Sequence, residues 1–119
     1  MTPIKNCIVN KDTKTNPIWL MRQAGRYLPE FKEIRKKNQD FIKLCLNANL
    51  SSEITLQPIK RFGFDGVIIF SDILMSPYAM GQKVEFEKNF GPRLGELNID
   101  KIKDIDEVDF TYRLNSVYK

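Results

Sequence analysis

The sequence predicts an α/β fold, on three observations. Residues 51–63 have the apolar spacing of a helix that ends at a glycine, residues 65–66 form an Asp-Gly turn, and Val67 to Phe70 is a continuous apolar run. Four apolar residues in a row, without polar alternation, are typical of a parallel strand that is buried on both faces. A helix, a short turn and such a strand together indicate α/β architecture.

Upstream of this unit, local signals predict a polar leader and two helices. Residues 1–16 are polar and are expected to form a loose leader before a domain that spans residues 17–119. Pro29 is suited to open a helix to about Lys37, with acidic residues early and basic residues late, as the helix dipole favours. Asp40 is expected to cap a second helix over residues 41–46.

The predicted helix before the apolar run has candidate caps at Ser51 and Ser52 and ends at Gly63, with Pro58 kinking it or breaking its hydrogen-bond ladder locally. Downstream, residues 71–78 are expected to form a short helix or loop. Val84 to Glu87 alternates like an exposed or edge strand, residues 89–92 carry a turn signal, and residues 104–109 open a further helix.

Composition limits the possible functions. The chain has 119 residues, 42% hydrophobic and 29% charged, as in a soluble globular domain or part of one. No apolar run approaches the roughly 20 residues of a membrane span, and no signal peptide core is present, so we expect a cytoplasmic protein without a membrane partner. The chain has no histidine and two cysteines, which argues against a metal site or a His-assisted nucleophile. Cys45 is predicted to be a small buried hydrophobe.

The net charge of +4 is concentrated between Arg22 and Lys43. Such a basic segment can attract nucleic acid or a polyanionic small molecule. For the lysines and arginine at 32 and 35–37, a solvated helix face is the simpler interpretation.

Arg22 and Arg26 are candidate anion-binding residues. Their planar guanidinium groups match carboxylate or phosphate oxygens. Taken without the surrounding motif, surface cations or partners of Glu30 and Glu33 are the commoner explanation for such a pair. Gly25 favours a loop that lines a cleft over an uninterrupted helix. Trp19, the only tryptophan, is predicted to be a core anchor.

Asp72 is the second candidate. It follows the predicted strand directly, and in α/β barrels catalytic groups stand at the carboxyl ends of strands. A partly desolvated carboxylate there would interact strongly with a cation or an N–H donor. A helix-capping role is the alternative, and position alone does not separate the two.

Two runs resemble the uroporphyrinogen decarboxylase family: Pro17-Ile18-Trp19-Leu20-Met21-Arg22-Gln23-Ala24-Gly25-Arg26, and residues 64–74 with the helix before them. The resemblance covers about residues 17–95. It implies a (β/α)8 TIM barrel of which this chain is an incomplete N-terminal part. It also implies a carboxy-lyase of heme biosynthesis that converts the four acetate side chains of uroporphyrinogen III to methyl groups, giving coproporphyrinogen III, and a homodimer when complete.

The resemblance also implies roles for particular residues. Arg22 and Arg26 would bind substrate carboxylates, and Asp72 would accept hydrogen bonds from pyrrole N–H groups and face the positive charge of a protonated pyrrole. The remaining substrate-binding positions would be a cleft wall of Gln23, Ala24 and Gly25 and an apolar surface of Met21, Ile68 and Phe70. No cofactor is needed, because the protonated pyrrole serves as the electron sink.

A complete barrel needs roughly 250 residues, so we expect the chain alone to be inactive and marginally stable. A split gene product, a truncated product or an incomplete gene model would each fit. The alternatives are a corrinoid-linked methyltransferase, which would need metal-binding His or Cys residues, and a small basic nucleic-acid-binding module, whose binding would depend steeply on salt.

Overall fold

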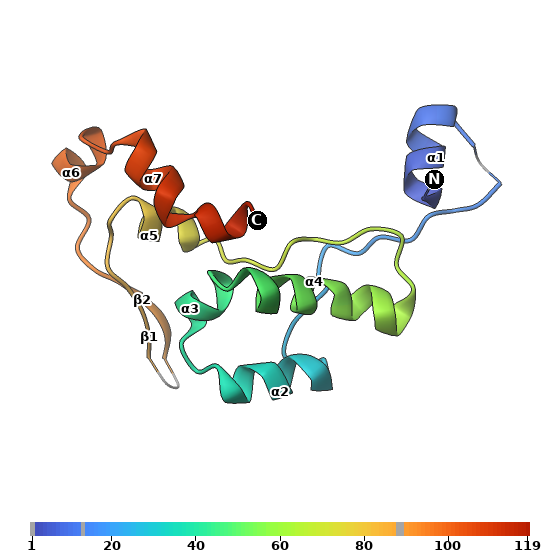
Figure 1. Ribbon diagram of the computed structural model, residues 1–119, viewed down its shortest axis with the longest axis horizontal. Coiled ribbons are helices and arrows are strands. Elements are labelled where there is room, and N and C mark those ends of the chain that lie inside the picture. The colour runs from blue at the N-terminus through green and yellow to red at the C-terminus, as the bar shows by residue number, and fades with distance from the viewer. Residues whose placement is uncertain (1, 13, 88–89) are drawn as a thin grey trace. The chain divides into compact units, whose positions relative to one another are not determined.

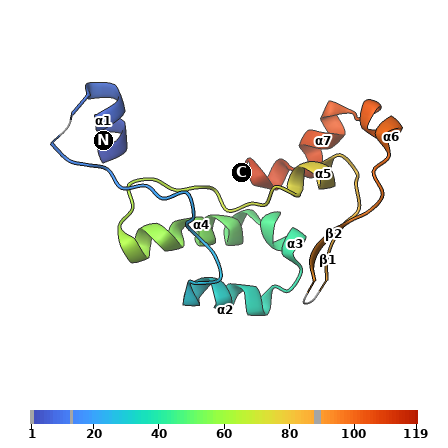
Figure 2. The ribbon, with the colours of Figure 1, turned by 180° about the vertical axis from the view of Figure 1, so that it is seen from behind.

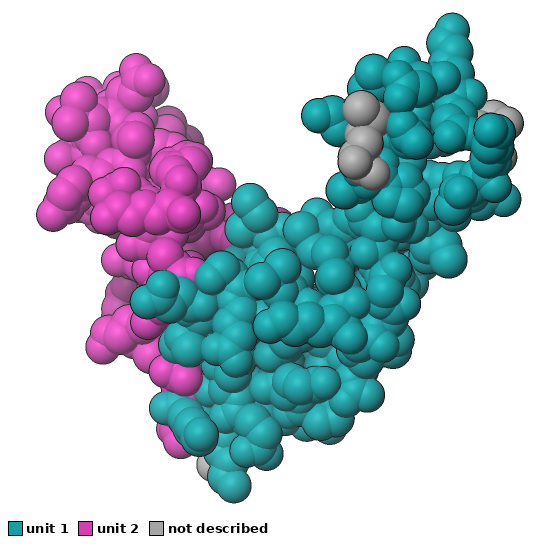
Figure 3. Space-filling model, turned by 45° about the vertical axis from the view of Figure 1, so that its right-hand side comes forward, with its two compact units in different colours: residues 1–37, 49–70 teal, residues 38–48, 71–119 magenta. Residues whose placement is uncertain are grey.

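The computed structural model describes residues 2–12, 14–87 and 90–119 (Figure 1). The chain divides into two compact units, residues 1–37 with 49–70 and residues 38–48 with 71–119, which Figure 3 distinguishes by colour. Among the described helices, none combines the length and apolarity that a membrane span requires. The fold is α/β in composition, with its one described sheet a two-stranded hairpin.

The first unit contains α1 (Pro3–Asn10), α2 (Pro29–Lys37) and most of α4 (Ala48–Phe62). Helix α2 has the bounds that the sequence predicts. Its Phe31 is buried, as are Leu28 before it and Ile54 and Pro58 on α4. These side chains form the core of the unit.

Helix α1 corrects the expectation of a loose leader. Its Thr2 cap has extended backbone, its side chain accepts a hydrogen bond from the Lys5 N–H at 3.4 Å, and Pro3 occupies the first helical turn. A threonine cap followed by proline is a recognised helix start. The low hydrophobicity of the segment hid this signal.

Helix α4 begins three residues before the predicted caps. Ser51 lies inside the helix and is buried, and its hydroxyl donates to the Phe70 carbonyl at 2.5 Å. The predicted end is confirmed: Gly63 has φ +70° and its N–H donates to the Ile59 carbonyl at 2.8 Å. The helix continues through Pro58, which has no N–H to donate to the preceding turn.

The predicted strand at residues 67–70 is wrong for this chain. The segment has no strand partner among the described residues, and Val67, Ile68 and Ile69 are 37%, 41% and 63% exposed. The apolar pattern predicted burial on both faces, but such burial requires neighbouring strands and covering layers, which local sequence does not supply. In both ribbon views the chain after Gly63 runs back along α4 (Figures 1 and 2).

The second unit contains α3 (Phe41–Cys45), α5 (Met75–Ala79), the strands β1 (Val84–Glu87) and β2 (Gly91–Leu94), α6 (Ile99–Lys103), α7 (Glu107–Arg113) and the short 3-10 helix η1 (Asn115–Val117). Asp40 caps α3 as expected, accepting from the Lys43 N–H at 3.1 Å. Cys45 is 1% exposed, which confirms its prediction as a buried hydrophobe.

The predicted strand at β1 is confirmed, and it pairs with β2 in antiparallel register from Val84 opposite Leu94 to Glu87 opposite Gly91. The turn signal was placed at residues 89–92, but Asn89 lies outside the described residues and Gly91 and Pro92 belong to β2. The Phe86 ring packs 4.7 Å from that of Phe41.

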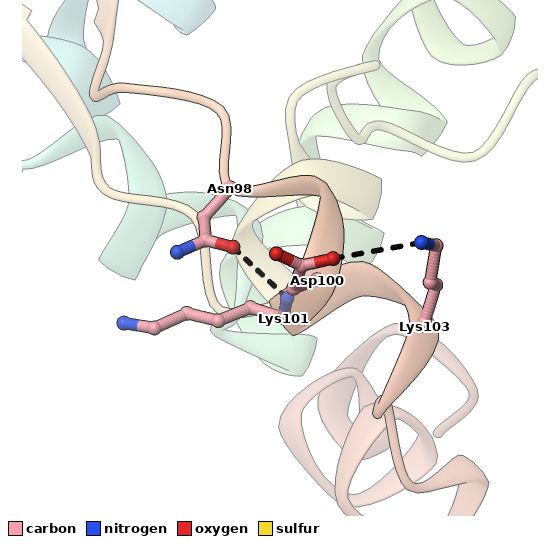
Figure 4. Close-up of polar contacts among 4 residues, drawn as sticks. All are labelled: Asn98, Asp100, Lys101 and Lys103. Atoms are coloured by element: carbon pink, nitrogen blue, oxygen red, sulfur yellow. Dashed lines mark hydrogen bonds and ion pairs between the residues drawn. The ribbon is translucent and has the colours of Figure 1, made fainter.

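Side-chain caps begin both C-terminal helices. Figure 4 shows Asn98 accepting from the Lys101 N–H at 3.1 Å at the start of α6, a helix that the sequence did not predict. Asp106 accepts from the Val108 N–H at 2.8 Å and opens α7, close to where a helix was expected.

The core of the first unit gives a stability prediction. Ile54 is 0% exposed and Ile73 is 88% exposed. Ile54→Ala should lower the free energy of unfolding by about 2–5 kcal/mol, because it loses burial and leaves a cavity. Ile73→Ala removes the same atoms and should change it by less than about 0.5 kcal/mol. Urea denaturation followed by circular dichroism measures both, and equal effects would contradict the assigned core.

Candidate functional site

The arginine motif is a loop tied by hydrogen bonds to residues 65–68. The Ile18 N–H donates to Asp65 Oδ2 at 2.8 Å, and the Asp65 N–H donates back to the Ile18 carbonyl at 2.9 Å. Five residues further along, Gln23 Nε2 donates to the Gly66 carbonyl at 3.1 Å and Gln23 Oε1 accepts from the Ile68 N–H at 3.1 Å. The two segments run beside each other in both ribbon views (Figures 1 and 2).

Three further side chains support the segment that faces this loop. Thr55 Oγ1 accepts from the Phe70 N–H at 2.8 Å, Ser51 binds the Phe70 carbonyl, and the Phe70 ring packs edge-on against Phe31 at 5.6 Å. Neither Ser51 nor Thr55 was predicted as a partner of this segment. Their signal was a pair of small polar residues four apart, and therefore on one face of an otherwise apolar helix pattern.

Gly66 allows the closest approach between the two segments. A Cβ at this position would lie 3.2 Å from Trp19 Cδ1 and 2.9 Å from Ile4 Cδ1. Trp19 itself is 48% exposed, so the expectation that it is a core anchor is wrong. Its ring covers the backbone of Gly66 with one edge and leaves the rest accessible.

Arg22 and Arg26 are both exposed, and neither forms an ion pair with a carboxylate among the described residues. The predicted loop around Gly25 is confirmed: residues 21–28 are not helical, and the Leu28 N–H donates to the Gly25 carbonyl at 3.0 Å. The motif therefore presents two guanidinium groups on a fixed, non-helical backbone.

Of the two alternative partners for these arginines, Glu30 is bound elsewhere and Glu33 forms no ion pair with either arginine among the described residues. Glu30 Oε1 lies 2.8 Å from Arg61 Nη2 and accepts from Arg61 Nε at 2.9 Å, which joins α2 to α4. A hydrogen bond from its own backbone N–H, and then the Arg61 guanidinium, hold the pKa of Glu30 below its ordinary value of 4.5. Glu30 therefore stays ionised near neutral pH and is committed to Arg61.

The other motif positions differ in exposure. Gln23 is only 5% exposed, and both ends of its amide bind backbone. Ala24, Gly25 and Phe70 are partly exposed. Met21, next to Arg22 in the sequence, is 77% exposed, and Ile68 is 41% exposed.

Asp72 belongs to the second unit and forms a turn immediately before α5. Its Oδ1 accepts from the Leu74 N–H at 2.9 Å and its carbonyl accepts from the Met75 N–H at 3.0 Å. One carboxylate oxygen, Oδ1, therefore has the capping role that was the alternative for this residue. Within the described part of the chain no hydrogen bond to Oδ2 is present.

These features define an α/β chain in which two exposed arginines, without an ion pair among the described residues, stand on a hydrogen-bonded loop. A carboxylate follows the extended segment to which this loop is bound. A family model described as uroporphyrinogen decarboxylase (URO-D) matches residues 1–119. The chain belongs to the uroporphyrinogen decarboxylase family.

Individual relatives agree with the family model. Proteins named uroporphyrinogen decarboxylase from Chelativorans sp. and Brucella ovis are 52% and 50% identical over 103 residues, 87% of this chain and 30% of each relative. The protein of that name from Roseobacter denitrificans is 46% identical over 120 residues, 98% of this chain and 34% of the relative. The chain therefore spans about a third of the length of the curated relatives it matches.

The packing at Gly66 gives a local prediction. Gly66→Ala should displace the Trp19 ring, shift the emission of this single tryptophan to longer wavelength and cost about 1–3 kcal/mol of stability. Gly25→Ala is the matched control, because its Cβ would lie 3.8 Å from the nearest Tyr27 atom, an ordinary contact. Unchanged Trp19 emission in Gly66→Ala would show that the indole does not cover this backbone.

Proposed function

We propose that the complete enzyme to which this sequence corresponds is a uroporphyrinogen decarboxylase, with a (β/α)8 barrel and a homodimeric assembly. Its substrate would be uroporphyrinogen III and its product coproporphyrinogen III. The observation that carries the proposal is the pair of exposed arginines, unpaired within the described residues, on a loop that matches the family. A substrate with many carboxylates requires such cations.

In the proposed reaction each acetate side chain loses its carboxylate after a proton is added to the adjacent pyrrole carbon. The C–C bond electrons flow into the protonated pyrrole and CO₂ leaves. A second proton then completes the methyl group, and the ring carbon releases the first proton, which restores the neutral pyrrole. Arg22 and Arg26 orient the substrate through its other carboxylates, and orientation lowers the barrier in its own right. Met21, Ile68 and Phe70 supply apolar surface for the macrocycle, beside Ala24 and Gly25.

Asp72 is the proposed catalytic carboxylate. Its unbonded Oδ2 can accept a pyrrole N–H and face the positive charge that develops on the ring. A preorganised group of this kind is typically worth about 3–4 kcal/mol of barrier. The turn made by Oδ1 holds the carboxylate in place for that purpose, so the capping and catalytic roles are compatible.

The activity is testable in a chimera in which this chain replaces the matching stretch of the Roseobacter denitrificans relative. We expect the chimera to convert uroporphyrinogen to coproporphyrinogen and the 119-residue chain alone to give no turnover. Chromatography of the oxidised porphyrins measures the conversion. The relative itself is the positive control. A folded chimera, matching the relative by circular dichroism, that produces no coproporphyrinogen would contradict the proposed function.

Asp72→Asn in this chimera separates catalysis from turn formation. Asparagine keeps an Oδ1 acceptor for the Leu74 N–H but loses the negative charge. We expect kcat to fall about 10²- to 10³-fold with the melting temperature preserved. The exposed Asp109→Asn is the control for a lost charge. A kcat within threefold of that of the parent chimera would mean that Asp72 stabilises the turn and has no catalytic role.

A further inference from the structure

Gln23 differs from its neighbours in the arginine motif because both ends of its side-chain amide bind protein backbone. The amide donates to the Gly66 carbonyl and accepts from the Ile68 N–H, both at 3.1 Å. This two-ended arrangement is the one that a neighbouring strand's backbone would offer to residues 66 and 68. Gln23 therefore takes the place of a strand residue at this edge.

The geometry leaves Gln23 little capacity to bind a ligand. One N–H and one lone pair of the amide remain, and the residue is only 5% exposed. Its neighbour Arg22 is exposed. Gln23 thus holds the loop, whereas the side chain of Arg22 beside it is exposed to solvent.

A second tie acts at the other end of the same loop. Ile18 and Asp65 exchange two hydrogen bonds, one to the Asp65 carboxylate and one to the Ile18 carbonyl, at 2.8 and 2.9 Å. Backbone between Ile18 and Gln23 is therefore fixed at both ends against a single segment. A loop held in this way has less freedom to lose when Arg22 binds an anion.

We propose that Gln23 is a positioning residue of the decarboxylase site: it fixes the arginine loop against residues 66–68 and acts on the substrate only through Arg22 and Arg26. This inference rests on the proposed function for its kinetic consequence, whereas its structural consequence is independent of that function. Gln23 belongs to the binding loop without touching the porphyrinogen.

The test compares Gln23→Ala with Gln82→Ala. Gln82 Nε2 donates to the Gly95 carbonyl at 2.8 Å, so its variant also loses a side-chain hydrogen bond to backbone, but away from every proposed site residue. Each variant is made in the 119-residue chain and in the chimera. Amide hydrogen exchange of the unliganded chain is measured by NMR, and KM and kcat for uroporphyrinogen are measured in the chimera.

In Gln23→Ala we expect exchange of the Ile68 amide to rise roughly tenfold, with the Phe70 amide, held by Thr55, changing less than threefold. KM should rise about tenfold with a smaller change in kcat, since the arginines bind in the ground state as well as in the transition state. Gln82→Ala should alter neither quantity. Gln23→Glu keeps the acceptor for Ile68 but replaces the donor to the Gly66 carbonyl with a second acceptor, so only part of the amide protection should return.

Several results would overturn the inference, in whole or in part. A raised KM with unchanged Ile68 exchange would mean that Gln23 contacts the substrate directly. Faster Ile68 exchange with unchanged KM and kcat would mean that the Gln23 hydrogen bonds stabilise the fold but do not affect substrate binding. An inert parent chimera would refute the proposed function and, with it, the kinetic role of Gln23. If Ile68 exchange in Gln23→Ala were also unchanged, the structural role of the Gln23 hydrogen bonds would be refuted as well.

Discussion

The hydrogen-bonding requirement of one extended segment organises the first unit. Residues 65–70 leave a helix and run back along it, and their backbone groups need partners because no strand lies beside them among the described residues. Side chains meet that requirement at alternate positions: Gln23 binds at 66 and 68, and Thr55 and Ser51 bind at 70. The arginine loop, helix α4 and the segment before Asp72 are consequently held as one body up to Phe70.

Local sequence signals predicted the elements that local interactions determine. The bounds of α2, the Asp40 cap of α3, the Gly63 end of α4 and the alternating strand β1 depend on residues close in sequence. The run from Val67 to Phe70 failed as a strand, because a strand is defined by its partner and the apolar pattern reports only a tendency to be buried. The predicted start of α4 failed for a related reason, since Ser51 serves a carbonyl nineteen residues away and not its own helix.

The charged residues of the candidate site could be predicted from the sequence, but the neutral residues that hold its backbone by hydrogen bonds could not. Arg22, Arg26 and Asp72 stand out in the sequence because they carry formal charge beside a glycine or a predicted strand end. Gln23, Thr55 and Ser51 are neutral, and their role appears only when segments more than a dozen residues apart are brought together. Trp19 shows the opposite error, because a large aromatic residue suggested a core position and instead lies half exposed over Gly66.

The central claim is that side chains replace a strand partner along one edge of residues 66–70, and amide hydrogen exchange of the unmodified chain tests it most directly. Slow exchange is expected at Ile68 and Phe70, whose N–H groups are bonded to Gln23 and Thr55, and fast exchange at Val67 and Ile69, which alternate with them along the segment. Equal exchange rates at all four amides would contradict it, since a segment that is either unattached or paired on both edges would show no such alternation.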